Sequence, residues 1–154
     1  MRKRVLIVED DPHVRKNLCG ILELRDFEVT GIATAEKAID LVHRVTFHVV
    51  SIDIGLDDND VTNTDGQKVL AEVVRLAEGT RALIVSGNRD QHLTIDAYER
   101  YGIARFLLKG QYTLTDFAAA VAKEASVAAL GVFGHFTSAS RTTSASTFCP
   151  SVFV

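Results

Sequence analysis

The sequence predicts an α/β fold, a doubly wound parallel sheet of five strands with helices on both faces. Two observations lead to this fold class. Short apolar runs, one of them weaker than the others, recur five times along the 154 residues, and stretches with apolar residues at helical spacing separate and follow them. Runs of this kind are typical of strands buried on both faces. Their alternation with helices favours a parallel sheet over an antiparallel one.

The first half of the chain provides two strands and two helices. The first strand, residues 3–8, is basic at its start and apolar to its end. Pro12 suits the first turn of a helix, and Asp11 is placed to cap it. Apolar residues then recur at helical spacing as far as residue 25. A second, weaker strand covers residues 28–33, and Thr34 can cap the helix that follows.

The second half continues the same alternation. The third strand, residues 47–52, has the strongest β pattern, and a long polar loop runs from Asp53 to Asp65. The remaining elements are a helix at 66–77, a strand at 81–86, a helix at 90–101, a strand at 104–108, and a fifth helix that Thr113 or Thr115 can cap.

Polar side chains follow the predicted strands at their carboxyl ends. They are Asp10 and Asp11 after the first strand, Asp53 after the third, Ser86 at the end of the fourth and Lys109 after the fifth. Ligands of such sheets bind beyond the carboxyl ends of the strands. Two carboxylates ~4 Å apart repel by roughly 4 kcal/mol at an effective dielectric near 20, so converging carboxylates need a cation or a proton. Singly, each residue has a plainer explanation as a helix cap, a turn residue or a surface lysine.

Together these residue types suit phosphoryl transfer. Mg²⁺ prefers oxygen ligands, and two or three carboxylates with a backbone carbonyl provide them. Asp53 can then act as a nucleophile that forms an aspartyl phosphate. Lys109 can pair with a phosphoryl oxygen, and the Ser86 hydroxyl can donate to another.

Residues 3–125 resemble the receiver domains of two-component response regulators, because several motifs of that family occur together and in the expected order. The matching segments are Val5-Leu6-Ile7-Val8-Glu9-Asp10-Asp11, Ile52-Asp53-Ile54, Asp65-Gly66, Ile84-Val85-Ser86-Gly87 and Tyr101-Gly102-Ile103-Ala104-Arg105-Phe106-Leu107-Leu108-Lys109.

The resemblance implies a fold and a set of site residues. The fold would be flavodoxin-like, with strand order 2-1-3-4-5. Asp53 would be the phosphoacceptor, and Mg²⁺ would be held by Asp10, Asp11, Asp53 and the backbone carbonyl of Gly55. The switch would consist of the Ser86 hydroxyl and the Phe106 ring, and Lys109 would sense the phosphate.

The sequence departs from the family pattern at three places. Gly110 follows Lys109 where the family usually has a proline after a cis peptide bond, so this loop is expected to be looser. The loop after Asp53 is longer than usual and rich in aspartate. Phe106 lacks the hydroxyl of the more common tyrosine.

Amino-acid composition argues against nucleic-acid binding and against membrane insertion. The chain is 47% hydrophobic with a net charge of −3, which is typical of a soluble globular domain and disfavours direct binding of nucleic acid by a basic surface. No apolar run reaches the ~20 residues that span a bilayer. We therefore expect a cytoplasmic protein without membrane insertion.

The C-terminal residues differ in composition from the rest. Residues 1–130 are expected to form the receiver domain. Residues 131–154 contain nine Ser or Thr and four Phe, and are expected to form a flexible or docked tail with no separate output domain.

The leading functional prediction is a signalling switch, not an enzyme, although it would assist its own phosphorylation and dephosphorylation. Its partners would be a sensor histidine kinase or phosphotransfer protein and a downstream protein. The downstream protein would bind the face formed by the fourth helix, fifth strand and fifth helix, with residues His92, Ile95, Tyr98, Tyr101 and Phe106. The alternative is a pseudo-receiver that binds proteins independently of phosphorylation, which the altered fifth loop, the acidic loop and the tail would favour.

Overall fold

The computed structural model describes residues 1–55, 65–76, 79–87 and 100–129. Five parallel strands form one sheet in the order β2-β1-β3-β4-β5, which confirms the predicted fold class and strand order. The strands are β1 (Arg4–Val8), β2 (Glu28–Ile32), β3 (Val49–Asp53), β4 (Arg81–Ser86) and β5 (Arg105–Leu108).

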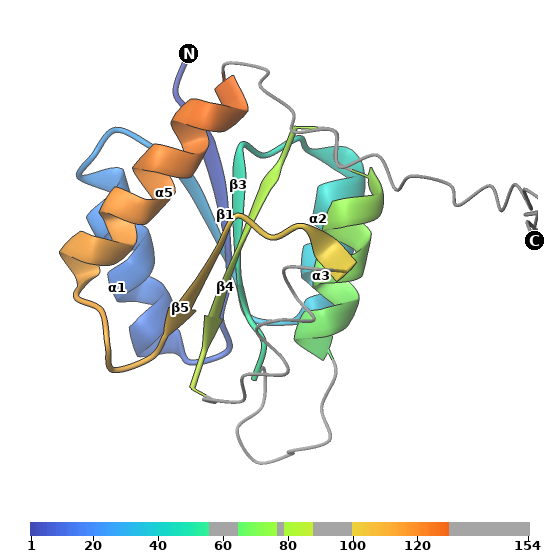
Figure 1. Ribbon diagram of the computed structural model, residues 1–154, viewed down its shortest axis with the longest axis horizontal. Helices are drawn as coiled ribbons and strands as arrows, with labels where there is room; N and C mark the ends of the chain where they lie inside the picture. The colour runs from blue at the N-terminus through green and yellow to red at the C-terminus, as the bar shows by residue number, and fades with distance from the viewer. Residues whose placement is uncertain (56–64, 77–78, 88–99, 130–154) are drawn as a thin grey trace, which may run out of the picture.

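Helices cover both faces of the sheet. Figure 1 shows helices packed on either side of the strands. One pair is α1 (Pro12–Glu23) and α5 (Leu114–Ala129), and the other is α2 (Ala35–Arg44) and α3 (Asp65–Leu76). The helix predicted at 90–101 falls almost entirely outside the described residues. Among the helices that the structure describes, none is both long and apolar enough to cross a bilayer.

Alternating side chains of the strands build two separate cores. In β1, Leu6 and Val8 belong to the core under α2 and α3, whereas Val5 and Ile7 belong to the core under α1 and α5. All four are at most 1% exposed. A strand buried on both faces needs apolar residues at every position, and this requirement explains the continuous apolar runs in the sequence.

Side-chain capping bonds hold the starts of α1 and α5. The Asp11 carboxylate accepts hydrogen bonds from the amides of His13 (2.7 Å) and Val14 (3.0 Å), and Pro12 occupies the first turn. Thr113, rather than Thr115, caps α5, because its hydroxyl accepts from the Asp116 amide while the Asp116 carboxylate accepts from the Thr113 amide. Thr34 occupies the N-cap position of α2 as predicted, but its side chain makes no capping hydrogen bond.

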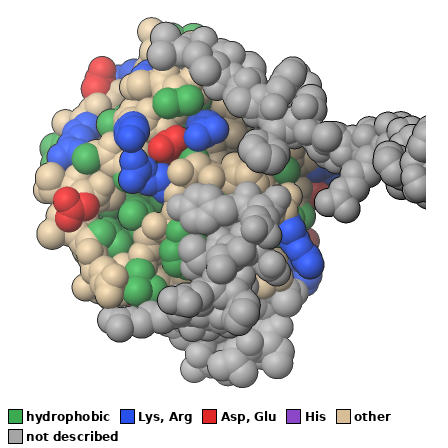
Figure 2. Space-filling view, in the orientation of Figure 1, with side chains coloured by type: hydrophobic (Ala, Val, Ile, Leu, Met, Phe, Trp, Pro, Cys, Tyr) green, Lys and Arg blue, Asp and Glu red, His purple; other side chains and the backbone are tan. Residues whose placement is uncertain are grey.

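A buried carboxylate joins α5 to the edge of the sheet. Glu124, whose side chain is 6% exposed, accepts two hydrogen bonds of 3.1 Å from Arg81 of β4. The Nε atom of Arg105, at the start of β5, lies 3.4 Å from its other oxygen. Figure 2 shows Lys and Arg side chains gathered around an acidic side chain on the visible face. This cluster therefore fixes α5 against β4 and β5.

Replacing Glu124 by Ala is expected to lower the free energy of unfolding by about 2 kcal/mol, because it leaves two arginines with a buried end unpaired. The cost stays below that of a fully buried pair since both arginines are about a third exposed. Urea denaturation of the full chain measures it. Glu36→Ala, at an exposed position of α2, is the matched control. Equal effects of the two substitutions would show that the cluster contributes nothing to stability.

Candidate functional site

Three carboxylates converge at the carboxyl end of the sheet. Asp53 is the last residue of β3, while Glu9 and Asp10 follow directly on β1, its neighbour in the sheet. These three residues can each place one carboxylate oxygen within 4.8 Å of the others. Asp53 is 2% exposed and Glu9 is 1% exposed. The predicted convergence of strand-end carboxylates is thus present, with Glu9 as a member that the sequence analysis did not assign to the site.

Lys109 provides the positive charge of the cluster. Its Nζ atom lies 2.5 Å from Asp53 Oδ2 and 3.3 Å from Glu9 Oε1. The amide of Lys109 donates to the carbonyl of Ser86 (2.8 Å), which continues the β4–β5 pairing one residue beyond β5. Gly110 then takes a positive φ of 81°, a conformation that glycine adopts without steric cost. The backbone at the end of β5 therefore aims Lys109 at Asp53.

The electrostatics of the cluster are strained without a further cation. Burial, together with the negative charge of Asp53, raises the pKa of Glu9 to about 7. Burial also acts to lower the pKa of Lys109, but its hydrogen bond to Asp53 and the charges of Asp53 and Glu9 outweigh this and raise it above its usual value. One ammonium group thus faces two buried carboxylates and a third, half-buried one.

The donor set fits Mg²⁺. Glu9 Oε2 is buried and has no hydrogen-bond partner among the described residues. A buried carboxylate oxygen of this kind is costly unless a cation or a proton satisfies it. Oxygen atoms from Glu9, Asp10 and Asp53 match the hard ligands that Mg²⁺ takes in proteins. These three residues would hold the ion, and water and a backbone carbonyl would complete its coordination.

Asp11 does not belong to this cluster, so its role as a metal ligand stays a prediction that the geometry does not support. Its side chain is exposed and accepts hydrogen bonds from two backbone amides at the start of α1, and these bonds lower the pKa of Asp11. Pro12 in the first helical turn places Asp11 at the N-cap, so only Glu9 and Asp10 lie between strand and cap. That spacing was visible in the sequence, and it could have identified Glu9 as the strand-end carboxylate.

The loop after β3 is held against the start of α3. The Gly55 amide donates to Asp53 Oδ1 (2.9 Å), which leaves the Gly55 carbonyl as a predicted metal ligand. A Cβ atom on Gly66 would lie 2.5 Å from the Asp53 carbonyl oxygen and 2.7 Å from the Ile54 Cα. Real Cβ atoms do not approach backbone atoms this closely. Glycine at 66 therefore lets α3 pack directly beneath the phosphoacceptor candidate.

The other predicted site residues lie on neighbouring strands. Ser86 ends β4 and is 3% exposed. Phe106, in β5, is half-buried and packs against the core under α2 and α3, as Tyr101 does. Of the residues proposed for the output face, His92, Ile95 and Tyr98 lie outside the described residues. The switch roles of Ser86 and Phe106 stay predictions.

The family model of the response regulator receiver domain matches residues 5–122. The chain belongs to this family. Receiver domains are signalling switches that bind Mg²⁺ at an acidic pocket, and phosphorylation and partner binding are general properties of the family. No curated protein resembles the chain closely enough in sequence to count as a match.

Solved structures show the same fold at low sequence identity. A CheY-like receiver domain protein from Methanospirillum hungatei JF-1 is 22% identical with a TM-score of 0.75, and the match covers 84% of this chain and 98% of that one. A response regulator from Thermotoga maritima is 17% identical with a TM-score of 0.69, over 82% and 99% of the two chains. A response regulator protein from Burkholderia pseudomallei, solved with a phosphorylated aspartic acid, calcium ion and citrate, is 21% identical with a TM-score of 0.67, over 83% and 71%.

Proposed function

We propose that this receiver domain accepts a phosphoryl group on Asp53 and passes the signal on through protein–protein contacts. The observation that carries the proposal is the buried Asp53 carboxylate, which lies 2.5 Å from Lys109 in a cluster with Glu9 and Asp10. The donor would be a sensor histidine kinase or a phosphotransfer protein, as is general in the family. The Burkholderia pseudomallei structure with a phosphorylated aspartic acid provides a precedent in the same fold.

The residues of the site divide the work of phosphoryl transfer. A carboxylate oxygen of Asp53 attacks phosphorus, the bond between phosphorus and the donor atom breaks, and the donor leaves with the electron pair. Lys109 exchanges its contact with the Asp53 carboxylate for one with a phosphoryl oxygen. Ser86, at the end of the neighbouring strand, donates its hydroxyl to another phosphoryl oxygen. When bound by Glu9, Asp10 and Asp53, Mg²⁺ supplies positive charge to offset the negative charge of the phosphoryl oxygens.

Incubation with acetyl phosphate and Mg²⁺ tests the proposal. The intact mass of the wild-type chain is expected to rise by one phosphoryl group, and Asp53→Asn is expected to abolish the increase. Asp11→Asn is the matched control, since asparagine also caps helices well and Asp11 lies outside the cluster. Hydroxylamine should remove the group, because it cleaves acyl phosphates but not phosphoserine or phosphothreonine.

A pseudo-receiver gives a different outcome in the same experiment. The observation that favours it is Gly110, whose positive φ of 81° lies outside the range of the proline usual at this place in the family. If neither acetyl phosphate nor other small donors modified the wild-type chain, Asp53 would not be an active phosphoacceptor. The chain would then be a binding module that keeps the acidic cluster.

A further inference from the structure

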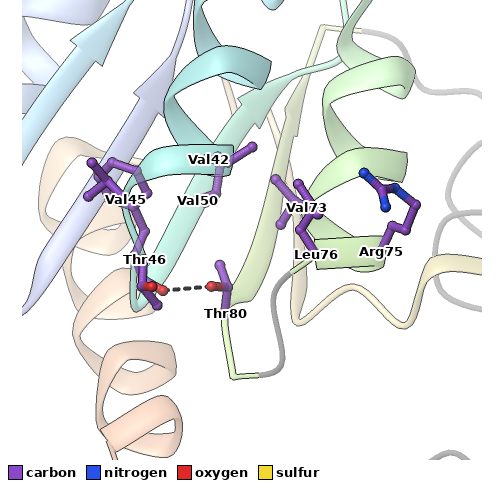
Figure 3. A pocket seen from close by; sticks show the side chains of 9 residues that line it. Val42, Val45, Thr46, Val50, Val73, Arg75, Leu76 and Thr80 are labelled. Atoms are coloured by element: carbon purple, nitrogen blue, oxygen red, sulfur yellow. Dashed lines mark hydrogen bonds between the residues drawn. The ribbon is translucent and has the colours of Figure 1, made fainter.

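A cavity of about 400 Å³, lined by six apolar and three polar residues, lies far from the acidic cluster. Its apolar wall consists of side chains from the last turns of α2 and α3, the segment before β3, and β3 itself. Figure 3 shows these side chains around the opening, with Thr80 and Thr46 along its edge. The apolar members are Val42, Val45, Phe47, Val50, Val73 and Leu76. A cavity of this size falls in the range of ligand-binding pockets in proteins.

The polar residues of the cavity give little for a polar ligand to bind. The Thr80 hydroxyl donates to the Phe47 carbonyl at 2.6 Å. The Arg75 guanidinium pairs with Glu72 at 2.8 Å. These two groups already have partners, and six of the nine lining residues are apolar, so the cavity can accept an apolar side chain.

The cavity opens at the edge of the sheet where the chain leaves α5. Thr46 and Phe47 precede β3 and Thr80 precedes β4, so the cavity lies at the amino ends of the strands. Helix α5 follows β5 and runs back to the same edge. The hydrogen bond from Lys3, just before β1, to Ser126, in the last turn of α5, shows this placement directly (3.1 Å).

The residues after Ala129 have the length and composition to fill the cavity. Twenty-five residues follow α5, and they include Phe133, Phe136, Phe148 and Phe153 but one charged side chain, Arg141. A chain of this length reaches at most roughly 80 Å. The radius of gyration of a 130-residue domain is roughly 14 Å, so the cavity is well within reach.

We propose that residues 130–154 dock into this cavity through one or more of their phenylalanine side chains. The contact is intramolecular, because the short connection from α5 gives the tail an effective concentration on the order of millimolar at the cavity. The docked tail covers Val42, Val45, Val73 and Leu76 at the edge opposite Asp53, so it leaves the phosphoacceptor site open. The inference is independent of the proposed phosphorylation.

Methyl NMR of the full chain tests the contact. Nuclear Overhauser effects between phenylalanine ring protons of the tail and the methyl groups of Val42, Val45, Val73 and Leu76 are expected. A full-length variant with all four tail phenylalanines replaced by Ser should lose these signals and shift the same methyl resonances. Methyl groups of Leu18 and Leu22, in the core on the other face of the sheet, should stay unchanged. Absence of the ring-to-methyl signals in the wild-type chain would overturn the proposal.

Limited trypsin digestion adds a matched pair of variants. Arg141 provides the single tryptic site in residues 131–154. Leu76→Glu places a charge in the cavity and is expected to speed cleavage after Arg141 roughly tenfold, since cleavage follows the population of the undocked tail. Val74→Glu, at an exposed position two residues away in α3, should leave the rate at the wild-type value. Equal cleavage rates in all three proteins would contradict docking.

Mixed samples separate a contact within one chain from a contact between two. In an equimolar mixture of isotope-labelled and unlabelled protein, filtered NMR spectra should contain no ring-to-methyl signals between the two populations. Signals between the populations would show that the tail of a second copy occupies the cavity, and would overturn the intramolecular contact.

Discussion

Replacing Gly66 by Ala is expected to lower the free energy of unfolding by about 3 kcal/mol. The new Cβ atom would lie 2.5 Å from the Asp53 carbonyl oxygen and 2.7 Å from the Ile54 Cα, both of which are backbone atoms. Because backbone cannot rotate out of the way as a flexible side chain can, α3 or the end of β3 must shift, and overpacking of this kind costs on the order of 1–3 kcal/mol or more. Chemical denaturation of the full chain measures the loss.

A second glycine in a helix provides a control of opposite sign. Gly20 lies within α1, and a Cβ atom there would meet nothing within 4 Å. Gly20→Ala should therefore raise the free energy of unfolding by about 0.5–1 kcal/mol through helix propensity alone. If Gly66→Ala were as well tolerated as Gly20→Ala, the close approach of α3 to the end of β3 would be wrong.

Gly66→Ala is expected to disturb the acidic site as well as the fold. Asp53 and Gly55 flank the backbone that Gly66 contacts, so a shift there moves both the carboxylate and the amide that hydrogen-bonds to it. Phosphorylation by acetyl phosphate should fall in Gly66→Ala at temperatures where the variant is still folded. A thermal denaturation curve of Gly66→Ala gives that temperature range.

Much of the fold could be predicted because its signals are local. A buried parallel strand needs an apolar run, and the central strands β1, β3 and β4 show one, whereas the edge strand β2 has exposed positions and a weaker pattern. Strand β4 has the predicted bounds, Arg81–Ser86. The apolar pattern predicts that the third strand begins two residues early, since Phe47 is as apolar as a strand residue yet lies before β3, in the core under α2 and α3. Asp53 is consequently inside the strand, where the sheet fixes its backbone.

The parts that could not be predicted depend on contacts between distant residues. The strand pattern predicts that Asp53 and Lys109 lie at one edge of the sheet, but their 2.5 Å approach depends on the order of β3, β4 and β5 in the sheet. Likewise, the pairing of Glu124 with Arg81 joins residues 43 positions apart, and no local sequence pattern predicts it. Asp11 was given two roles, helix cap and metal ligand, and the two amides at the start of α1 already engage its carboxylate.

Replacing Glu9 by Gln is expected to stabilise the metal-free protein in a pH-dependent way. The pKa of Glu9 is about 7 in the folded state against 4.5 for a solvated glutamate, so the folded state binds this proton more tightly than the unfolded chain does. Stability contributed by protonated Glu9 is therefore present below pH 4.5 and is lost as the pH rises through about 7. A shift of this size corresponds to on the order of 3 kcal/mol.

The measurement is the free energy of unfolding of the wild type and of Glu9→Gln across this pH range without divalent cations. The difference in favour of Glu9→Gln should grow by about 3 kcal/mol between the two pKa values and then level off. Glu28→Gln, at an exposed position of β2, should show no such growth. A constant difference would mean that Glu9 has the same pKa in the folded and the unfolded protein, with Lys109 alone able to offset the burial of its carboxylate.

Binding of Mg²⁺ at the acidic site should depend on the protonation of Glu9. A carboxylate must be deprotonated to bind the ion, so Mg²⁺ should raise the melting temperature of the wild type more above pH 7 than below it. Glu9→Gln should show a smaller rise, because one charged ligand is missing, and Asp11→Asn should match the wild type. The opposite ranking would return Asp11 to the metal site and remove Glu9 from it. The comparison thus tests, without any phosphoryl donor, which carboxylates this receiver domain uses to hold a cation.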